Sequence, residues 1–150
     1  MKLHPETKSI AVITDNTTTG EIFRKNLEQV SKDYSGITEI ISLDGSKITR
    51  AELLKNLQGL PKSSQVIFLN FHRDKTDRFI PCTKFIPILF SSIKSPFYCA
   101  SDNFLGYGTV GGMLNSAFHQ GEAAGKMARL ILQGEDVADI PVLKQSPNRY

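Results

Sequence analysis

IAVITDNTTTGEIFRKNLEQV, residues Ile10–Val30, contains a strand, a loop and a helix in direct succession. The run Ser9–Thr14 is apolar and rich in β-branched residues, which is typical of a strand buried on both faces. After a polar loop, Thr18 and Glu21 have the spacing of a capping box, which predicts Thr18 as the N-cap of a helix. Apolar residues recur on one face of that helix, at Phe23, Leu27 and Val30.

The alternation of strands and helices continues along the chain. Residues 38–43 and 65–71 are predicted strands, and Thr49 with Glu52 forms a second capping box, which opens a leucine-rich helix ending at residues 59–61. Apolar residues from Cys82 onward favour a helix that is distorted or broken at Pro87. Four further elements are predicted, namely a fourth strand, a short fifth strand, a helix capped by Gly134 and an edge strand, over residues 96–101, 111–116, 118–133 and 140–145.

This order of elements predicts βαβ units with right-handed crossovers. We therefore expect an α/β fold, a three-layer α/β/α sandwich around a mostly parallel, doubly wound sheet of about five strands. The polar residues 1–8 are predicted to be flexible, and residues 9–150 to form a single α/β lobe. A length of 150 residues agrees with one domain.

The composition is that of an ordinary soluble globular protein, with 40% hydrophobic and 22% charged residues. The net charge of +3 is small and the basic residues are scattered, which argues against a nucleic-acid partner. No apolar run reaches the 18 residues of a membrane span, and an export signal, if the protein has one, is expected outside this chain. Cys82 and Cys99 are either small buried residues or one disulfide.

In open α/β sheets, ligands bind beyond the carboxyl ends of the strands. This rule selects four loops, Asp15–Gly20, Asp44–Ser46, Asn70–Asp74 and Ser101–Tyr107. The first is the most suggestive, because the N-terminus of a helix, with its threonine hydroxyls, suits a carboxylate or a phosphate. The threonines have an alternative role as a simple helix cap with neighbours that face water.

Each of the other candidate residues also has a structural alternative. His72 is either a ligand contact or a solvated loop residue, and Asp102 with Asn103 is either a ligand-binding pair or an ordinary turn. Tyr107 and Phe104 either form an apolar wall of the site or pack against the sheet.

Gly106, Gly108 and Gly111 have the G-x-G-x-x-G spacing of a dinucleotide-binding turn. That motif requires a helix that opens at the third glycine, and here the predicted helix begins several residues later. We therefore interpret the glycines as turn residues that position Asp102 and Tyr107 and then redirect the chain.

The sequence contains no signature of catalysis or metal binding. The histidines lack metal-ligand spacing, the sequence places no partner histidine near a serine or cysteine, and the phosphate-loop and nucleophile-elbow motifs are absent. We expect no enzyme activity, no cofactor and no metal. A phosphoacceptor receiver domain and a small α/β enzyme remain as alternatives, although a receiver needs a second acidic residue beside Asp15.

Four stretches of the sequence together resemble a known family. IAVITDNTTTGEIFRKNLEQV, SPFYCASDNFLGYGTVGGMLNS, GEAAGKMARLILQGEDVADIPV and SPNRY are similar to the second lobe of the type I periplasmic-binding-protein fold. The sequence resembles the substrate-binding proteins of ABC transporters and the related sensor domains of histidine kinases and diguanylate cyclases. The resemblance covers nearly the whole chain and is weakest in its middle third.

The resemblance implies a two-lobed clamshell that closes on a small polar ligand of the amino-acid or organic-acid type. It implies a membrane-anchored transport or signalling partner and a periplasmic or extracytoplasmic location. Ligand contacts would come from the loops after the first, third and fourth strands. Carried over to this sequence, the contacts are Asn16, Thr17, Thr18, Thr19, Asn70, His72, Asp102 and Tyr107.

A complete protein of this type is about twice as long, so we expect this chain to be a fragment without its first lobe. The helix over residues 118–133 then belongs with the missing lobe. Its apolar face, with Ala124, Met127, Ala128 and Ile131, would need another cover. We therefore expect some homodimerisation through this helix.

Overall fold

The computed structural model describes residues 4–143 and contains one parallel sheet of four strands. The strands are β1 (Ser9–Thr14), β2 (Glu39–Asp44), β3 (Ser64–Phe68) and β4 (Phe97–Cys99), in the order β2-β1-β3-β4. Both neighbours of β1 pair with it in parallel, and β4 pairs in parallel with β3. The predicted α/β class and parallel sheet are confirmed.

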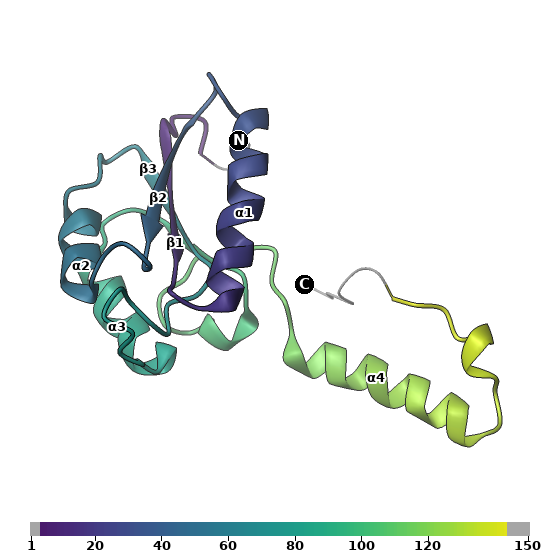
Figure 1. The fold of residues 1–150 in the computed structure, drawn as a ribbon. Helices are drawn as coiled ribbons and strands as arrows, with labels where there is room; N and C mark the ends of the chain where they lie inside the picture. Colours follow the sequence, from purple (N-terminus) through teal and green to yellow (C-terminus); the bar gives the residue numbers. More distant parts are fainter. Residues whose placement is uncertain (1–3, 144–150) are drawn as a thin grey trace.

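Helices cover both faces of the sheet, which confirms the three-layer sandwich (Figure 1). Helix α1 (Thr18–Asp33) lies on one face, and α2 (Arg50–Gln58) and α3 (Cys82–Ser92) lie on the other. The apolar core lies between the sheet and α2 and α3, where the completely buried side chains include Phe68, Phe71, Leu53, Phe85 and Leu89.

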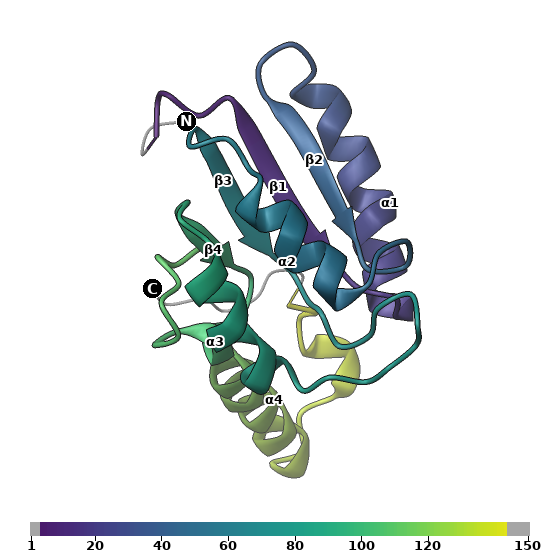
Figure 2. The same ribbon diagram turned by 90° about the vertical axis from the view of Figure 1, so that its left-hand side faces the viewer.

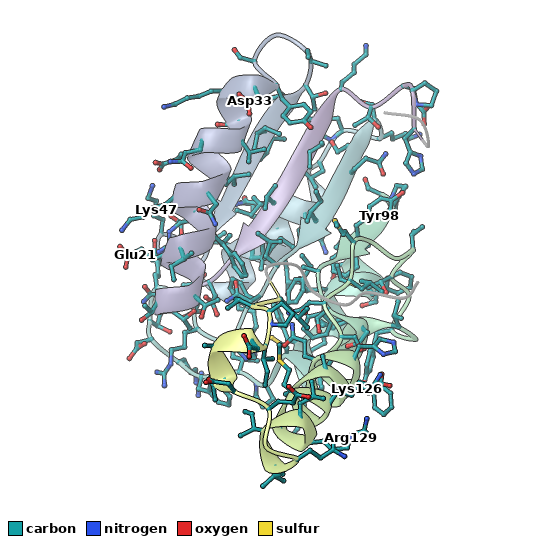
Figure 3. All side chains as sticks on the ribbon, turned by 90° about the vertical axis from the view of Figure 1, so that its right-hand side faces the viewer. Glu21, Asp33, Lys47, Tyr98, Lys126 and Arg129 are labelled. Atoms are coloured by element: carbon teal, nitrogen blue, oxygen red, sulfur yellow. The ribbon has the colours of Figure 1, made fainter. Side chains whose placement is uncertain are left out.

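Helix α1 covers its face of the sheet only in part. Gly20 is its one buried residue, and strands β1 and β3 stay in view beside the helix (Figure 3). Its N-cap is Thr17, whose hydroxyl accepts a hydrogen bond from Gly20 N at 3.1 Å. The predicted N-cap, Thr18, was wrong by one residue, because Asp15 holds the backbone and hydroxyl of Thr17 in place.

The second capping box is confirmed. Thr49 accepts a hydrogen bond from Glu52 N at 3.2 Å, and the Glu52 carboxylate accepts one from Thr49 N at 2.7 Å.

Helix α3 runs through Pro87 without a break. Pro87 and Thr83, whose carbonyl would have accepted the missing bond, are both exposed, so water can take the place of the lost donor.

The predicted fifth strand does not form. Residues 110–116 run beside β4 and the residues after it, and are linked to them by two isolated parallel bridges, Tyr98 in β4 with Gly111 and Ser101 beyond β4 with Asn115. Gly111 and Gly112 have φ values of +138° and +155°, which interrupt the regular pleat. The sheet therefore has four strands and an irregular edge rather than five strands.

Helix α4 (Ala117–Leu132) leaves the three layers and extends beyond the carboxyl ends of the strands (Figures 1 and 2). None of its residues is buried. Gly134 follows with a φ of +96° and ends the helix as predicted. A short 3-10 helix, Val137–Asp139, comes next, and no strand forms over residues 140–143. The rest of the predicted edge strand and the SPNRY segment lie outside the described residues.

The two cysteines are small buried residues and do not form a disulfide. Cys82 and Cys99 are both buried and unpaired.

The first described residues contact the sheet. Lys8 N donates to Ser63 O, and His4 Nε2 lies 2.6 Å from the Tyr98 hydroxyl. That residues 1–8 form a flexible segment before a single lobe stays a prediction. No helix in the described range is long and apolar enough to cross a membrane.

Candidate functional site

Asp15 connects the loops that follow β1 and β3. Its side chain is completely buried, and Oδ1 accepts hydrogen bonds from the backbone and hydroxyl of Thr17 at 3.2 and 2.5 Å. Oδ1 also accepts one from Asn70 Nδ2 at 2.9 Å, and Oδ2 accepts one from His72 N at 2.9 Å. The carboxylate therefore fixes three of the predicted ligand-binding residues relative to one another.

Gly20 allows the first turn of α1 to approach this carboxylate. A Cβ atom at position 20 would lie 2.2 Å from Asp15 O and 2.4 Å from Asp15 Oδ1, which leaves no space for a side chain. Arg24 Nη1 donates to the same Asp15 carbonyl at 2.5 Å and lies 3.1 Å from Asp44 Oδ1. The Asp44–Ser46 loop thus supports the end of β1 from outside the site.

The loops line an open cavity of about 620 Å³ at the carboxyl edge of the sheet. Four of the eight predicted residues line it, namely Thr17, Thr19, Asn70 and His72. Asn103 and Phe104, which were candidates from the sequence with structural alternatives, also line it. The lining residues that were not singled out are Phe23, Leu69, Arg73, Phe79 and Ser101.

The other four predicted residues lie around this cavity without lining it. Asn16 N donates to Arg73 O at 2.8 Å, so Asn16 joins the loops, and Thr18 is exposed in the first turn of α1. Asp102 begins a short 3-10 helix, Asp102–Phe104, and Tyr107 is 37% exposed in the glycine segment that follows. The structure therefore does not bring Tyr107 to the wall of this cavity.

Two features of the cavity leave hydrogen-bonding capacity for a ligand. The backbone N–H groups of Thr18 and Thr19 have no acceptor among the described residues, as is usual in the first turn of a helix. Asn70 is 8% exposed, and its buried Oδ1 has no partner in the described range, while its Nδ2 donates to Asp15. The start of α1 thus offers donors at the cavity, and Asn70 Oδ1 is an unsatisfied acceptor buried beneath the cavity surface.

The structure brings Cys82 next to His72, a cysteine–histidine pair that was not expected from the sequence. Its Sγ lies 3.4 Å from His72 Nδ1 and donates to Phe71 O at 3.4 Å. Burial raises the pKa of the Cys82 thiol to about 11, so the thiol is neutral at physiological pH. Among residues 4–143, no group of three or more His, Cys, Asp or Glu side chains could hold a metal ion.

Sequence reasoning selected the loops of the candidate site but did not single out Asp15, the residue that connects them. Asp15 was considered only as the first acid of a receiver domain, whereas a carboxylate directly after a buried strand and before a helix was the available signal. Arg73 lies in the selected Asn70–Asp74 loop but was not singled out there, and Phe79 was missed because it lies beyond the selected loops, in a part of the chain without a motif.

Comparison with known proteins agrees with the resemblance in the sequence. A family model described as ABC transporter substrate binding protein matches residues 2–149. No curated protein and no solved structure matches the chain. Members of this family bind a substrate for an ABC transporter and are typically periplasmic or extracytoplasmic. Because the match spans nearly its full length, the chain belongs to the family of ABC transporter substrate-binding proteins.

Proposed function

We propose that this chain is the second lobe of a two-lobed protein that binds a small polar ligand between its lobes without chemical change. The observation that carries this proposal is the convergence of the two loops on the buried carboxylate of Asp15. These hydrogen bonds hold the two loops in place when no ligand is bound, which lowers the conformational cost of binding.

An amino acid or an organic acid fits the free groups of the site. A ligand carboxylate would accept hydrogen bonds from the N–H groups of Thr18 and Thr19, where the helix dipole favours negative charge. A ligand ammonium or hydroxyl would donate to Asn70 Oδ1. Asn16, Thr17, His72, Asp102 and Tyr107 complete the proposed contact set, and Asp102 and Tyr107 would act as the lobes close.

We also propose that the protein does not catalyse a reaction of its ligand. A nucleophilic cysteine needs a thiolate, and burial keeps the Cys82 thiol protonated. The buried carboxylate of Asp15 already accepts four hydrogen bonds, so a proton transfer from a ligand would have to displace one of them.

The missing first lobe and a membrane-anchored partner belong to the same proposal. Helix α4 extends beyond the carboxyl ends of the strands, where a second lobe would close over the ligand (Figure 1). The partner is an ABC transporter or, as in the related sensor domains, a signalling protein. When the first lobe is absent, a second copy of the chain would cover α4.

A thermal-shift screen with amino acids and small organic acids tests the binding function on a protein that contains both lobes. Binding raises the melting temperature by mass action, and a ligand at 100 times its Kd contributes about 2.7 kcal/mol. Thr19→Glu would place a negative charge in the cavity, which repels a ligand carboxylate, and abolish the rise. Gln29→Glu, exposed on the same helix, is the control that keeps it. A screen without any rise, or a rise that Thr19→Glu leaves intact, contradicts the proposal.

A further inference from the structure

Residues 72–80 form a loop after β3 that is fixed by its own buried carboxylate. Asp74 is 5% exposed, and its Oδ1 accepts hydrogen bonds from the backbone and hydroxyl of Thr76 at 2.9 and 2.5 Å. Asp74 Oδ2 accepts one from Arg50 N at 2.9 Å, and Ile80 N donates to His72 O at 2.7 Å. The 72–80 loop is therefore a preformed wall of the cavity.

Phe79 presents an aromatic ring on this wall. It is 58% exposed, whereas Phe71 and Phe85 in the core are completely buried. The Phe79 ring is parallel to the His72 ring within 3°, with the ring centroids 6.0 Å apart. When a flat apolar group of a ligand covers an exposed aromatic ring, apolar surface leaves water, which favours binding.

Arg73 supplies the positive charge next to that ring. Its guanidinium lies over the Phe79 ring, 5.9 Å from the centroid, so a ligand reaches the part of the ring that Arg73 leaves exposed. Arg73 Nη1 lies 3.2 Å from Asp77 Oδ1 and donates to Asp77 O at 2.8 Å. The two side chains are 40% and 72% exposed, and ion pairs at such positions contribute little free energy. An acidic group of a ligand can therefore replace the Asp77 carboxylate at low cost.

We propose that the 72–80 loop determines which ligands the site accepts, and that these are small acids carrying a flat apolar group. The acid binds at Arg73 and the first turn of α1, and the flat group lies on Phe79. This inference rests on the proposed function, because it takes the same cavity to be the ligand site. It replaces the expectation of a purely polar ligand with an amphiphilic one.

An NMR titration of the ¹⁵N-labelled 150-residue chain tests the inference, because it detects the weak binding expected of a single lobe. The probes are phenylacetate, acetate and benzyl alcohol, which carry both groups, the acid alone and the ring alone. We expect phenylacetate to bind roughly two- to tenfold more tightly than either of the others. Its signals should shift at the start of α1 and along the 72–80 loop.

Two variants separate the contributions of ring and charge. Phe79→Leu keeps apolar volume but loses the flat ring, so we expect phenylacetate binding to weaken roughly two- to tenfold and acetate binding to stay unchanged. Arg73→Gln should weaken both acids roughly tenfold and leave benzyl alcohol unchanged. Phe118→Leu, at a 75% exposed phenylalanine on α4, is the control that should change none of these affinities.

The outcomes distinguish failure of this inference from failure of the proposed function. If both acids shift the start of α1 but bind equally well, or if Phe79→Leu has no effect, the inference is wrong and the ligand site stands. If no probe shifts any signal around the cavity at millimolar concentration, both are wrong.

Discussion

The Asp15 side chain combines the high cost of a buried charge with four hydrogen bonds that compensate for it. All four partners are donors, so the Asp15→Asn amide would direct an NH₂ group at another donor. We expect this variant to lose about 2–3 kcal/mol of unfolding free energy, with relief of the buried charge offsetting part of the damage. Urea denaturation measures the loss.

Asp33→Asn is the matched control for that substitution. Asp33 is the last residue of α1 and is exposed, at the helix end where a negative charge is unfavourable (Figure 3). Its replacement should leave stability unchanged or raise it slightly. Equal stability of the Asp15→Asn and wild-type proteins would show that the carboxylate is not the structural centre of the site.

Glu52 gives the protein a pH dependence that can be assigned to one residue. Its hydrogen bonds with Lys75 and Thr49 lower the pKa of Glu52 from 4.5 to about 2. A carboxyl group whose pKa is lower in the folded state stabilises the fold above pH 4.5, and this contribution is lost as the pH falls toward 2. Glu52→Gln should therefore differ from wild type near pH 7 and converge with it near pH 2.

Urea denaturation of both proteins between pH 2 and pH 7 measures this convergence. Glutamine keeps the capping-box hydrogen bond to Thr49 N, so the comparison isolates the charge. The Glu52 side chain is half exposed, so solvent screens its charge, and wild type should be the more stable of the two proteins near pH 7. A difference that stays constant down to pH 2 would contradict the assignment.

At the level of elements, the sequence predicted those whose pattern is local. Strand β1 and helix α2 have the expected boundaries because apolar runs and a capping box determine them within one element. The fifth strand was not predictable in this way, since it depended on whether residues 111–116 could pair with β4. The candidate site shows the same difference between local and long-range features. The strand ends indicated its loops, whereas no local pattern indicated that Phe79 lies beside them.

The glycine segment makes the turn expected of it, and Gly108 is its most constrained position. Its φ is +94°, and an added Cβ would lie 2.3–2.5 Å from the ring of Phe90. Gly106 has a φ of +85° but open space around it. Gly106→Val should cost about 1–2 kcal/mol from backbone strain, and Gly108→Val about 1 kcal/mol more from the contact with Phe90.

Thermal unfolding of the two valine variants measures that difference. The ligand response of a two-lobed protein carrying Gly108→Val tests the second part of the interpretation, that the segment positions Asp102 and Tyr107. Wild-type stability together with a wild-type ligand response would refute both parts.

At the scale of the whole molecule, the three layers pack against one another, whereas helix α4 packs against little else. The layers share one apolar core, while Phe118, Ile131 and Leu132 on α4 are 75%, 45% and 87% exposed. Helical stability in proteins comes mainly from the packing of an apolar face. Helix α4 therefore needs a partner that the rest of the described lobe does not provide.

The chain on its own should consequently form dimers through α4, and sedimentation velocity over a range of concentrations measures this association. Ala128→Glu places a charge on the exposed apolar face and should shift the equilibrium to monomer, because a charge buried in the interface has no partner there. Lys126→Glu adds the same residue on the charged face, where Lys126 pairs with Glu122 (Figure 3), and should leave the dimer intact. A wild-type chain that stays monomeric at the highest concentration would mean that α4 is stable without a second copy, which would leave the first lobe as its proposed partner.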